Sequence, residues 1–436
     1  MKEVPFDRKV IHAMIQEMGL DMALGSIREM NQLVNDVVKR FDTEFIRMEF
    51  GVPGLKAGRI AAEAEAKMLI EDEVANTYPP FQGTPELKSA GSEFCKAFMD
   101  MDIPPECVIP TVGSMQGCFI ALGLAGFHNP EKSTILFLDP GFPVNKKQVD
   151  FYGLNSISLE LKDCRGDDLK NEVDRLCREH PIAGCMWSSP NNPAWIILSE
   201  DELEGLAEVF DKHGVFAIED MAYFGMDFRQ DYSKPYEPPY QPTIARYMER
   251  VFITLSSSKL FSYAGQRCGL ALIPPKFASQ KFPALQSRFT KPDILGAFVH
   301  GGIYPTTSGV PQGPQRGLAT LLKATVDGSY SPWESVRTYQ HRAAFMKKTF
   351  LENGFSLVYD RDRDKPLADG FYFTISYPGM NSGQLAEEMI YYGISAITLD
   401  VTGSTQQGLR ACVSLFREDQ FEILAYRLKR FHEDHQ

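Results

Sequence analysis

Between about residues 58 and 325, short apolar runs alternate with longer stretches in which apolar residues recur at helical spacing. Each short run ends in polar or small residues, as buried strands commonly do. The longer stretches, such as residues 200–213, are amphipathic. This alternation predicts an α/β fold with a mostly parallel sheet flanked by helices. The predicted strands are STILFLDP (133–140), IAGCMWSSP (182–190), GVFAIED (214–220), RVFITLSS (250–257) and CGLALIPP (268–275).

The two ends of the chain follow other patterns. Residues 10–41 have mainly helical periodicity, with interruptions expected at Gly19 and Gly25. The last third contains two predicted strands, at residues 370–378 and 408–416, followed by a final helix.

These patterns predict two domains. A large domain is expected at residues 58–325 and a smaller α+β domain at residues 326–436. Residues 1–57 are expected to form an N-terminal extension and part of the small domain.

Composition narrows the class of protein. Hydrophobic residues make up 44% of the 436 residues and charged residues 23%, which is typical of a folded chain. The net charge is −12 and no basic residues cluster, so we expect no nucleic-acid partner. A small anionic cofactor is still compatible, because local cations and helix N-termini can bind one.

The sequence also bears on location and metal binding. The first twenty residues lack the apolar core of a signal peptide, and no apolar run is long enough to span a bilayer, so we expect no membrane association. The eight cysteines show no CxxC pair and no metal-binding spacing. We therefore expect reduced thiols, no metal site and a cytoplasmic protein.

Ligands of such sheets bind beyond the carboxyl ends of the strands, so the residues that follow each apolar run are candidate ligand-binding residues. In RVFITLSSSKLFSYAGQRCG, Lys259 follows a predicted strand within a serine-rich turn, and Arg267 comes eight residues later. Most loop lysines are simply solvated. A lysine in a desolvated site can instead have an activated amine that forms a Schiff base.

Other strand ends carry polar or aromatic residues that each have an ordinary explanation. Asp220 ends one strand with Tyr223 after it, and it could cap a helix or pair with a charged cofactor. Asn192 precedes a proline, which alone signals only a turn. Ser114 begins an apolar helix, where it could be an N-cap or part of an anion site. Phe142 lies in a Gly-Pro turn, where a phenylalanine is normally a packing residue.

The order and spacing of these features resemble those of the class I/II pyridoxal-phosphate aminotransferases of fold type I. The segment SSSKLFSYAGQRCG is similar to that family's Ser-x-x-Lys followed by Gly-x-Arg-x-Gly. The resemblance extends over nearly the whole chain, through GSIREMNQLV, TYPPFQGTPELKSA and GLRACVSLF. It implies a fold type I architecture, a large domain plus a smaller α+β domain. The first twenty-odd residues have no clear counterpart.

The resemblance implies a role for each residue around the cofactor ring. Lys259 would carry pyridoxal 5′-phosphate covalently and later move a proton to and from the substrate's Cα. Asp220 would face the pyridine nitrogen and keep it protonated. Asn192 and Tyr223 would hydrogen-bond the phenolic oxygen, and Phe142, where the family often has Tyr or Trp, would stack on the ring.

The resemblance also implies a phosphate site. Backbone N–H groups of Ser114 and Met115 would bind the phosphate at the start of a helix. Ser256, Ser258 or both would complete the site with Arg267, whose guanidinium matches a phosphate in a bidentate way.

The remaining implied residues concern the substrate and the partner subunit. Arg410 would bind the substrate's α-carboxylate, and Gly51 would let the backbone approach it closely. Tyr78 would reach the phosphate of a neighbouring subunit, which implies a homodimer with shared active sites. The sequence departs from the family after Asn192, where Pro-Ala-Trp replaces the common Pro-Thr-Gly, so the loop there is expected to be reshaped.

The resemblance implies an aminotransferase that moves the amino group of an amino acid to a 2-oxo acid by a ping-pong route. Another fold type I enzyme, such as a carbon–sulfur β-lyase or an amino acid decarboxylase, would use the same lysine, aspartate and arginine. A non-catalytic ligand-binding protein is a third alternative, against which the intact set of residues argues.

The expected amino donor is neutral. In dicarboxylate-specific relatives, the neighbouring subunit donates a second arginine to the distal carboxylate. Residues 297–315, which correspond loosely to that region, contain no lysine or arginine. Tyr304 and Phe142 could form an aromatic wall there instead, whereas a buried distal carboxylate without a cation would be costly. The alternative is that an arginine elsewhere in the chain, such as Arg28 or Arg363, serves an acidic substrate.

Overall fold

The computed structural model describes residues 3–436, which form two compact units. The smaller unit has three segments of the chain: the residues up to Gly54, Asn192–Ile196 and Arg337–Gln436. The larger unit consists of Leu55–Asn191 and Ile197–Val336. The domain bounds predicted from the sequence, 1–57, 58–325 and 326–436, remain predictions and differ from the bounds of these units. They did not foresee that residues 192–196, in the middle of the predicted large domain, cluster with the smaller unit.

A seven-stranded sheet forms the centre of the larger unit, in the order β2-β8-β7-β6-β5-β3-β4. Pairing is parallel from β7 to β4, and β8 is antiparallel to both of its neighbours. All five predicted strands are therefore confirmed, as is the mostly parallel sheet. The strands are β2 (Val108–Thr111), β3 (Thr134–Asp139), β4 (Asn155–Glu160), β5 (Ile182–Ser188), β6 (Phe216–Met221), β7 (Val251–Ser256) and β8 (Gly269–Leu272).

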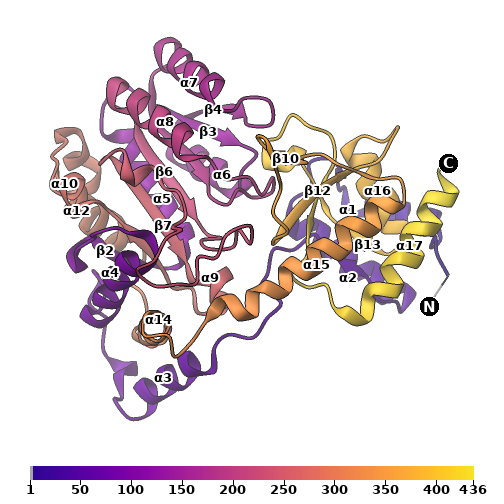
Figure 1. Ribbon diagram of the computed structural model, residues 1–436, viewed down its shortest axis with the longest axis horizontal. Helices are drawn as coiled ribbons and strands as arrows, with labels where there is room; N and C mark the ends of the chain where they lie inside the picture. The colour runs from indigo at the N-terminus through magenta and orange to yellow at the C-terminus, as the bar shows by residue number, and fades with distance from the viewer. Residues whose placement is uncertain (1–2) are drawn as a thin grey trace. The chain divides into compact units, whose positions relative to one another are not determined.

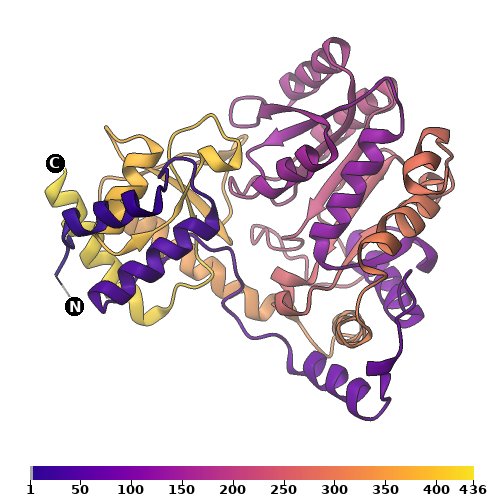
Figure 2. The same ribbon diagram turned by 180° about the vertical axis from the view of Figure 1, so that it is seen from behind.

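Helices cover both faces of this sheet. Figure 2 shows α5 (Gly113–Phe127) across one face, and α8 (Glu200–His213) lies on the other face in Figure 1. α5 is apolar almost all round and most of its side chains are buried, as expected of a helix enclosed by other elements. The other helices of eight or more residues are α3 (Arg59–Ile70), α4 (Pro85–Met99), α6 (Pro143–Tyr152), α7 (Asp167–Glu179) and α14 (Gln312–Val326).

Local sequence explains where several helices begin and end. A capping box formed by Ser199 and Glu202 starts α8, and Gly214 ends it in the left-handed conformation. In the smaller unit, Gly19 ends α1 (Arg8–Met18) at φ +60, where only glycine is unstrained. The predicted interruption of the N-terminal helix at Gly19 is thus confirmed.

The smaller unit joins the two ends of the chain, which appear side by side as indigo and yellow ribbons in Figure 1. Its four-stranded antiparallel sheet has the order β14-β15-β12-β9, and β1 pairs in parallel with β13. The strands of these two sheets are β1 (Ile46–Arg47), β9 (Ser356–Leu357), β12 (Tyr372–Ser376), β13 (Ile394–Ser395), β14 (Ile397–Thr398) and β15 (Leu409–Cys412), and β10 (Arg361–Asp362) pairs separately with β11 (Lys365–Pro366). The other helices are α2 (Ile27–Phe41), α16 (Ser382–Tyr391) and α17 (Phe421–Asp434), while α15 (Pro332–Glu352) contains the division between the units.

Candidate active site

The central strands of the larger unit bring their polar residues into one row. Ser188 on β5 is paired in register with Asp220 on β6, which is paired with Thr254 on β7. Parallel neighbours end at the same edge of a sheet, so the segments that follow these strands also emerge together. This edge holds most of the residues singled out from the sequence.

Lys259 lies in the short helix α9 (Ser257–Leu260), which begins immediately after β7. The Ser256 hydroxyl caps this turn by accepting a hydrogen bond from the backbone N–H of Ser258 at 3.1 Å. Lys259 is half-buried, and its Nζ lies 5.8 Å from the centre of the Tyr223 ring. The structure therefore brings Lys259 and Tyr223 together, as the sequence predicted.

Asp220 is a buried carboxylate whose partners are neutral. Its Oδ1 accepts a hydrogen bond from the Thr254 hydroxyl at 2.8 Å, and the backbone of Ala222 supplies a second one. No lysine, arginine or histidine of residues 3–436 forms an ion pair with it. Burial raises the pKa of Asp220 to about 6, and these hydrogen bonds oppose the rise. The site can thus accept a cationic group of a ligand.

The start of α5 lies against Arg267. Gly113 donates its backbone N–H to the Arg267 carbonyl at 3.0 Å and has φ +66. A side chain at Gly113 would place a Cβ 2.4 Å from the Arg267 Nη2, so glycine is required for this close approach. Ser114 follows at the helix N-terminus, whose free N–H groups attract anions. Arg267 itself is exposed.

The other residues predicted around the cofactor are more scattered. Met115 is exposed and its carbonyl accepts a hydrogen bond from Gln148 at 3.0 Å. Phe142 is half-buried at the start of α6. Tyr78 is 92% exposed in the single chain, which leaves its side chain available to another molecule. Their roles remain predictions.

Arg410 lies on β15 in the smaller unit and is 1% exposed. Its Nη2 donates to the Glu49 carbonyl at 2.9 Å and its Nη1 to Asn192 Oδ1 at 3.4 Å, whereas its Nε has no hydrogen-bond partner among the described residues. The segment with Asn192 thus meets Arg410 within this unit. A buried guanidinium without a carboxylate partner has donors available for an anionic ligand.

Tyr372 is a residue that the sequence interpretation missed. The Arg410 guanidinium carbon lies 4.7 Å from the centre of its ring, and a Cβ at Gly51 would lie 2.2 Å from its hydroxyl oxygen. Gly51 is therefore needed to accommodate Tyr372, in addition to any role in approaching a carboxylate. The two C-terminal strands were predicted, but their antiparallel pairing was not, and it is this pairing that places Tyr372 and Arg410 diagonally on one face.

These residues fit pyridoxal 5′-phosphate. Asp220 is a buried carboxylate without a cationic partner, as a protonated pyridine nitrogen requires. Gly113 and Arg267 form a cradle that a single Cβ would fill, at a helix N-terminus suited to a phosphate. Lys259 supplies an amine in the turn after β7, the strand that pairs with β6 at Asp220.

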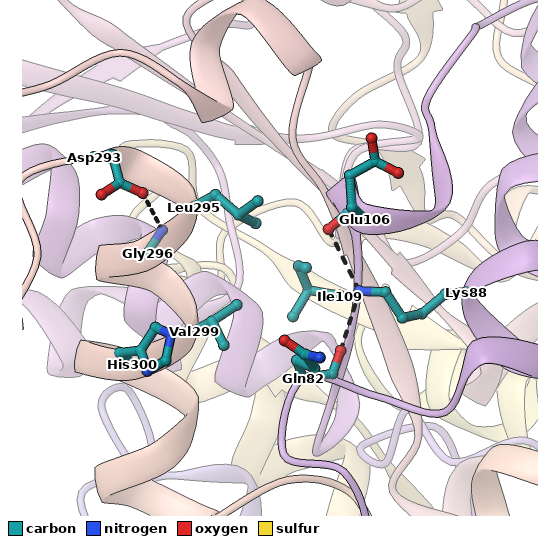
Figure 3. A pocket seen from close by; sticks show the side chains of 9 residues that line it. All are labelled: Gln82, Lys88, Glu106, Ile109, Asp293, Leu295, Gly296, Val299 and His300. Atoms are coloured by element: carbon teal, nitrogen blue, oxygen red, sulfur yellow. Dashed lines mark hydrogen bonds between the residues drawn. The ribbon is translucent and has the colours of Figure 1, made fainter.

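A separate cavity of about 310 Å³ in the larger unit contains none of these residues (Figure 3). Its lysine, Lys88, donates to the carbonyl oxygens of Gln82, Glu106 and Val108 at 3.1, 3.4 and 2.9 Å. Burial lowers the pKa of Lys88 to about 8. All three ammonium hydrogens thus have backbone partners, so we assign Lys88 a structural role.

Two further observations concern metals and membranes. Within residues 3–436, no group of histidine, cysteine, aspartate or glutamate side chains is arranged to hold a metal ion. None of the helices in this part of the chain is long and apolar enough to cross a membrane. All eight cysteines are free, and six of them are buried.

Comparison with known proteins agrees with this arrangement. The sequence model of the family described as aminotransferase class I and II matches residues 51–299, more than half of the chain. The chain belongs to this family. The predicted resemblance is thus confirmed, and the family match includes every cofactor residue predicted from the sequence.

Relatives within the aminotransferase family are distant. The LL-diaminopimelate aminotransferase 2 of Nostoc sp. is 28% identical over 165 residues, which cover 36% of this chain and 40% of that protein. The probable aspartate/prephenate aminotransferase of Aquifex aeolicus is 25% identical over 207 residues, 46% of this chain and 49% of that protein. The chain spans about half the length, or less, of these curated relatives.

Solved aminotransferase structures match the fold over nearly the whole chain. An aspartate aminotransferase mutant from Thermus thermophilus has a TM-score of 0.73 at 17% identity and covers 92% of this chain and 95% of its own. An aminotransferase from Mycobacterium tuberculosis has a TM-score of 0.76 at 16% identity, with 94% and 96% covered. The predicted fold type I architecture is therefore confirmed.

Proposed function

We propose that this protein is a pyridoxal-phosphate-dependent aminotransferase that moves the amino group of an amino acid to a 2-oxo acid in two half-reactions. The observation that carries the proposal is the pairing of Asp220 on β6 with Thr254 on β7, the strand that leads directly to Lys259. Family membership supports it. The eight free cysteines support a cytoplasmic location.

Each residue has a specific task in this proposal. When bound, the cofactor supplies an electron sink for the bond broken at the substrate's Cα. Asp220 holds the positive charge at the pyridine nitrogen, and Arg267 with the N-terminus of α5 binds the phosphate. Lys259 removes the proton from the substrate's Cα and returns one in the second half-reaction. Arg410 orients the substrate by binding its α-carboxylate with two parallel N–H donors.

Asn192, Tyr223 and Phe142 complete the proposed cofactor site. By the family resemblance, Asn192 and Tyr223 would hydrogen-bond the phenolic oxygen of the cofactor, and Phe142 would pack against its ring. The resemblance assigns further phosphate donors to Ser114, to Met115 and to Ser256, Ser258 or both. Ser114 and Met115 lie at the N-terminus of α5, which is chemically suited to a phosphate.

Replacement of Lys259 tests the proposal. Lys259→Ala should remove the visible absorption of the bound cofactor, and borohydride should no longer fix the cofactor to the chain. Lys88→Arg is the matched control, since Lys88 is also half-buried but has a backbone partner for each ammonium hydrogen. A reducible adduct that persists in Lys259→Ala but not in Lys88→Arg would overturn the assignment. Conversion of the cofactor to its pyridoxamine form by an amino acid alone separates transamination from elimination or decarboxylation.

We further propose a homodimer in which Tyr78 serves the partner's phosphate site. The exposure of Tyr78 supports this, because a tyrosine 92% exposed has no packing role in the single chain. Mixing inactive Tyr78→Ala and Lys259→Ala chains should restore activity, since one of the two sites in the mixed dimer would be intact. Full activity from a protein that is monomeric by light scattering would refute the proposal.

The proposed amino donor is a neutral amino acid, either apolar or aromatic. Residues 297–315 contain no lysine or arginine, and Tyr304 in this segment is 59% exposed with its ring 5.2 Å from that of Phe81. Aspartate is the competing donor, because several relatives are named as aspartate aminotransferases. Measured kcat/KM for aspartate, alanine, leucine and phenylalanine with one common 2-oxo acid decides between them. A tenfold preference for aspartate, about 1.4 kcal/mol, would exclude a neutral donor.

A further inference from the structure

We propose that Thr254 is a positioning residue that sets the orientation and charge of Asp220 through the hydrogen bond between its hydroxyl and Asp220 Oδ1. The proposal rests on the proposed function, in which Asp220 holds a positive charge at the cofactor. Thr254 would act only through Asp220 and would not contact the substrate.

The first argument is the geometry of the pair. Thr254 and Asp220 are direct neighbours in the parallel pairing of β7 with β6, and the hydroxyl donates to Oδ1 at 2.8 Å. Thr254 is fully buried, so the bond is shielded from competing water. The Thr254 hydroxyl and the backbone of Ala222 together restrict the rotation of the carboxylate, which has further lone pairs to accept from a ligand.

The second argument is that α5 fixes the threonine. The Cys118 thiol lies 3.5 Å from the Thr254 hydroxyl oxygen. A Cβ at Gly117, on the same helix, would lie 3.1 Å from the Thr254 methyl carbon, so the side chain has little room to rotate. Burial raises the pKa of Cys118 well above its usual range, so the thiol stays neutral. Asp220 is therefore the group of these three that titrates near neutral pH.

The consequence is electrostatic. A hydrogen bond to a carboxylate favours its charged form, and the Thr254 bond lowers the pKa of Asp220 against the effect of burial. Without it, a larger share of Asp220 would be neutral at pH 7, and a neutral acid cannot hold a pyridinium. The loss should appear both in the titration of Asp220 and in the binding of the cofactor.

Two variants of Thr254 separate the hydroxyl from packing. Thr254→Val keeps the branched shape and removes the donor, whereas Thr254→Ser keeps the donor and removes the methyl. Thr243→Val is the matched control, since Thr243 donates to the buried Glu219 at 2.6 Å from another part of the chain. Thr254→Val and Thr243→Val make the same exchange of a buried hydroxyl for a methyl, so a general loss of stability from this exchange would affect them alike.

The measurements use the full chain. In the ligand-free protein, carbon NMR of labelled aspartate carboxyls should show a higher pKa of Asp220 in Thr254→Val and an unchanged pKa in Thr254→Ser and Thr243→Val. Titration with pyridoxal phosphate should show affinity reduced roughly three- to tenfold in Thr254→Val alone, in line with the usual net contribution of one hydrogen bond. Asp220→Asn identifies the resonance.

The outcomes are distinct. If Thr254→Val titrates and binds like the unmodified protein, or if Thr243→Val is affected equally, the proposal is wrong. If the unmodified protein does not bind pyridoxal phosphate, the proposed function fails, while the NMR titration still decides whether Thr254 controls the charge of Asp220.

Discussion

Two neighbouring residues of β6, Glu219 and Asp220, are both buried carboxylates, yet they face opposite sides of the sheet and have different surroundings. Glu219 accepts hydrogen bonds from the Thr243 hydroxyl at 2.6 Å and the Ile244 backbone at 3.2 Å, two adjacent residues of one loop. Asp220 is bonded to the adjacent strand at Thr254 and to Ala222.

The contrast shows that burial alone does not identify a functional acid. Burial raises the pKa of Glu219 to about 7 and that of Asp220 to about 6, so the direction of the pKa shift does not show which of the two is functional. They differ in what their partners do. Glu219 fastens a remote loop to the sheet, whereas the partners of Asp220 are already fixed by the sheet and helix, and its bonds stabilise only its own position.

The largest expected effect is on activity. Asp220→Asn keeps the shape of the side chain but cannot carry charge, and kcat/KM should fall on the order of 10²–10³-fold, the usual loss when one electrostatic group of an active site is removed. Glu219→Gln should remain within about threefold of the unmodified protein. Steady-state assays with the preferred donor measure both. If kcat/KM fell equally in both variants, Asp220 and Glu219 would not differ in function.

The second-largest expected effect is the change of the free energy of unfolding with pH. Because the folded state raises the pKa of Glu219 from 4.5 to about 7, it holds the proton more tightly than the unfolded chain does. This stabilisation is present below about pH 4.5 and is lost as the pH rises through about 7, a loss of about 3 kcal/mol. Glu219→Gln should lack it.

Urea unfolding at several pH values measures this difference. The free energy of unfolding of the unmodified protein should fall relative to that of Glu219→Gln between about pH 4.5 and 7. For Asp220→Asn the corresponding fall should lie lower, between about pH 4 and 6. If the two falls in unfolding free energy occurred over the same pH range, Glu219 and Asp220 would not have the different environments described above.

A smaller effect extends the comparison to two buried arginines of the smaller unit. Arg427 donates to the Gly393 and Glu44 carbonyls at 2.7 Å each, whereas Arg410 retains an Nε without a partner among residues 3–436. Arg410→Lys should raise KM for the amino donor roughly 10-fold, because lysine cannot bind a carboxylate in a bidentate way. Arg427→Lys should leave KM unchanged and lower the unfolding free energy by about 1 kcal/mol. A raised KM in Arg427→Lys would argue against a special role of Arg410.

Much of this arrangement could be predicted from the sequence. The central strands were predictable because they are buried on both faces and therefore continuously apolar. Lys259 and Asp220 were found because they follow or end such strands in a recognisable order. Thr254 could not be found in this way, since it lies inside a predicted strand where threonine is ordinary.

Tertiary packing explains the rest of what was missed. The assignment of residues 192–196 to the smaller unit depends on contacts with Arg410 and its neighbours, far away in the sequence. Tyr372 acquires its significance from the ring contact with Arg410 and from the space that Gly51 leaves. The local periodicity of apolar residues in the sequence does not indicate such contacts.

The parallel pairing of β1 with β13 has a consequence for synthesis on the ribosome. Ile46 is paired with Ile394, 348 residues later. At roughly 5–20 residues per second, the N-terminal segment waits on the order of 20–70 s for its partner to emerge. During that time the apolar side of α2, which includes Leu33 and Val37, has no core to enter. We expect the nascent N-terminus to depend on a chaperone, while the larger unit can already fold.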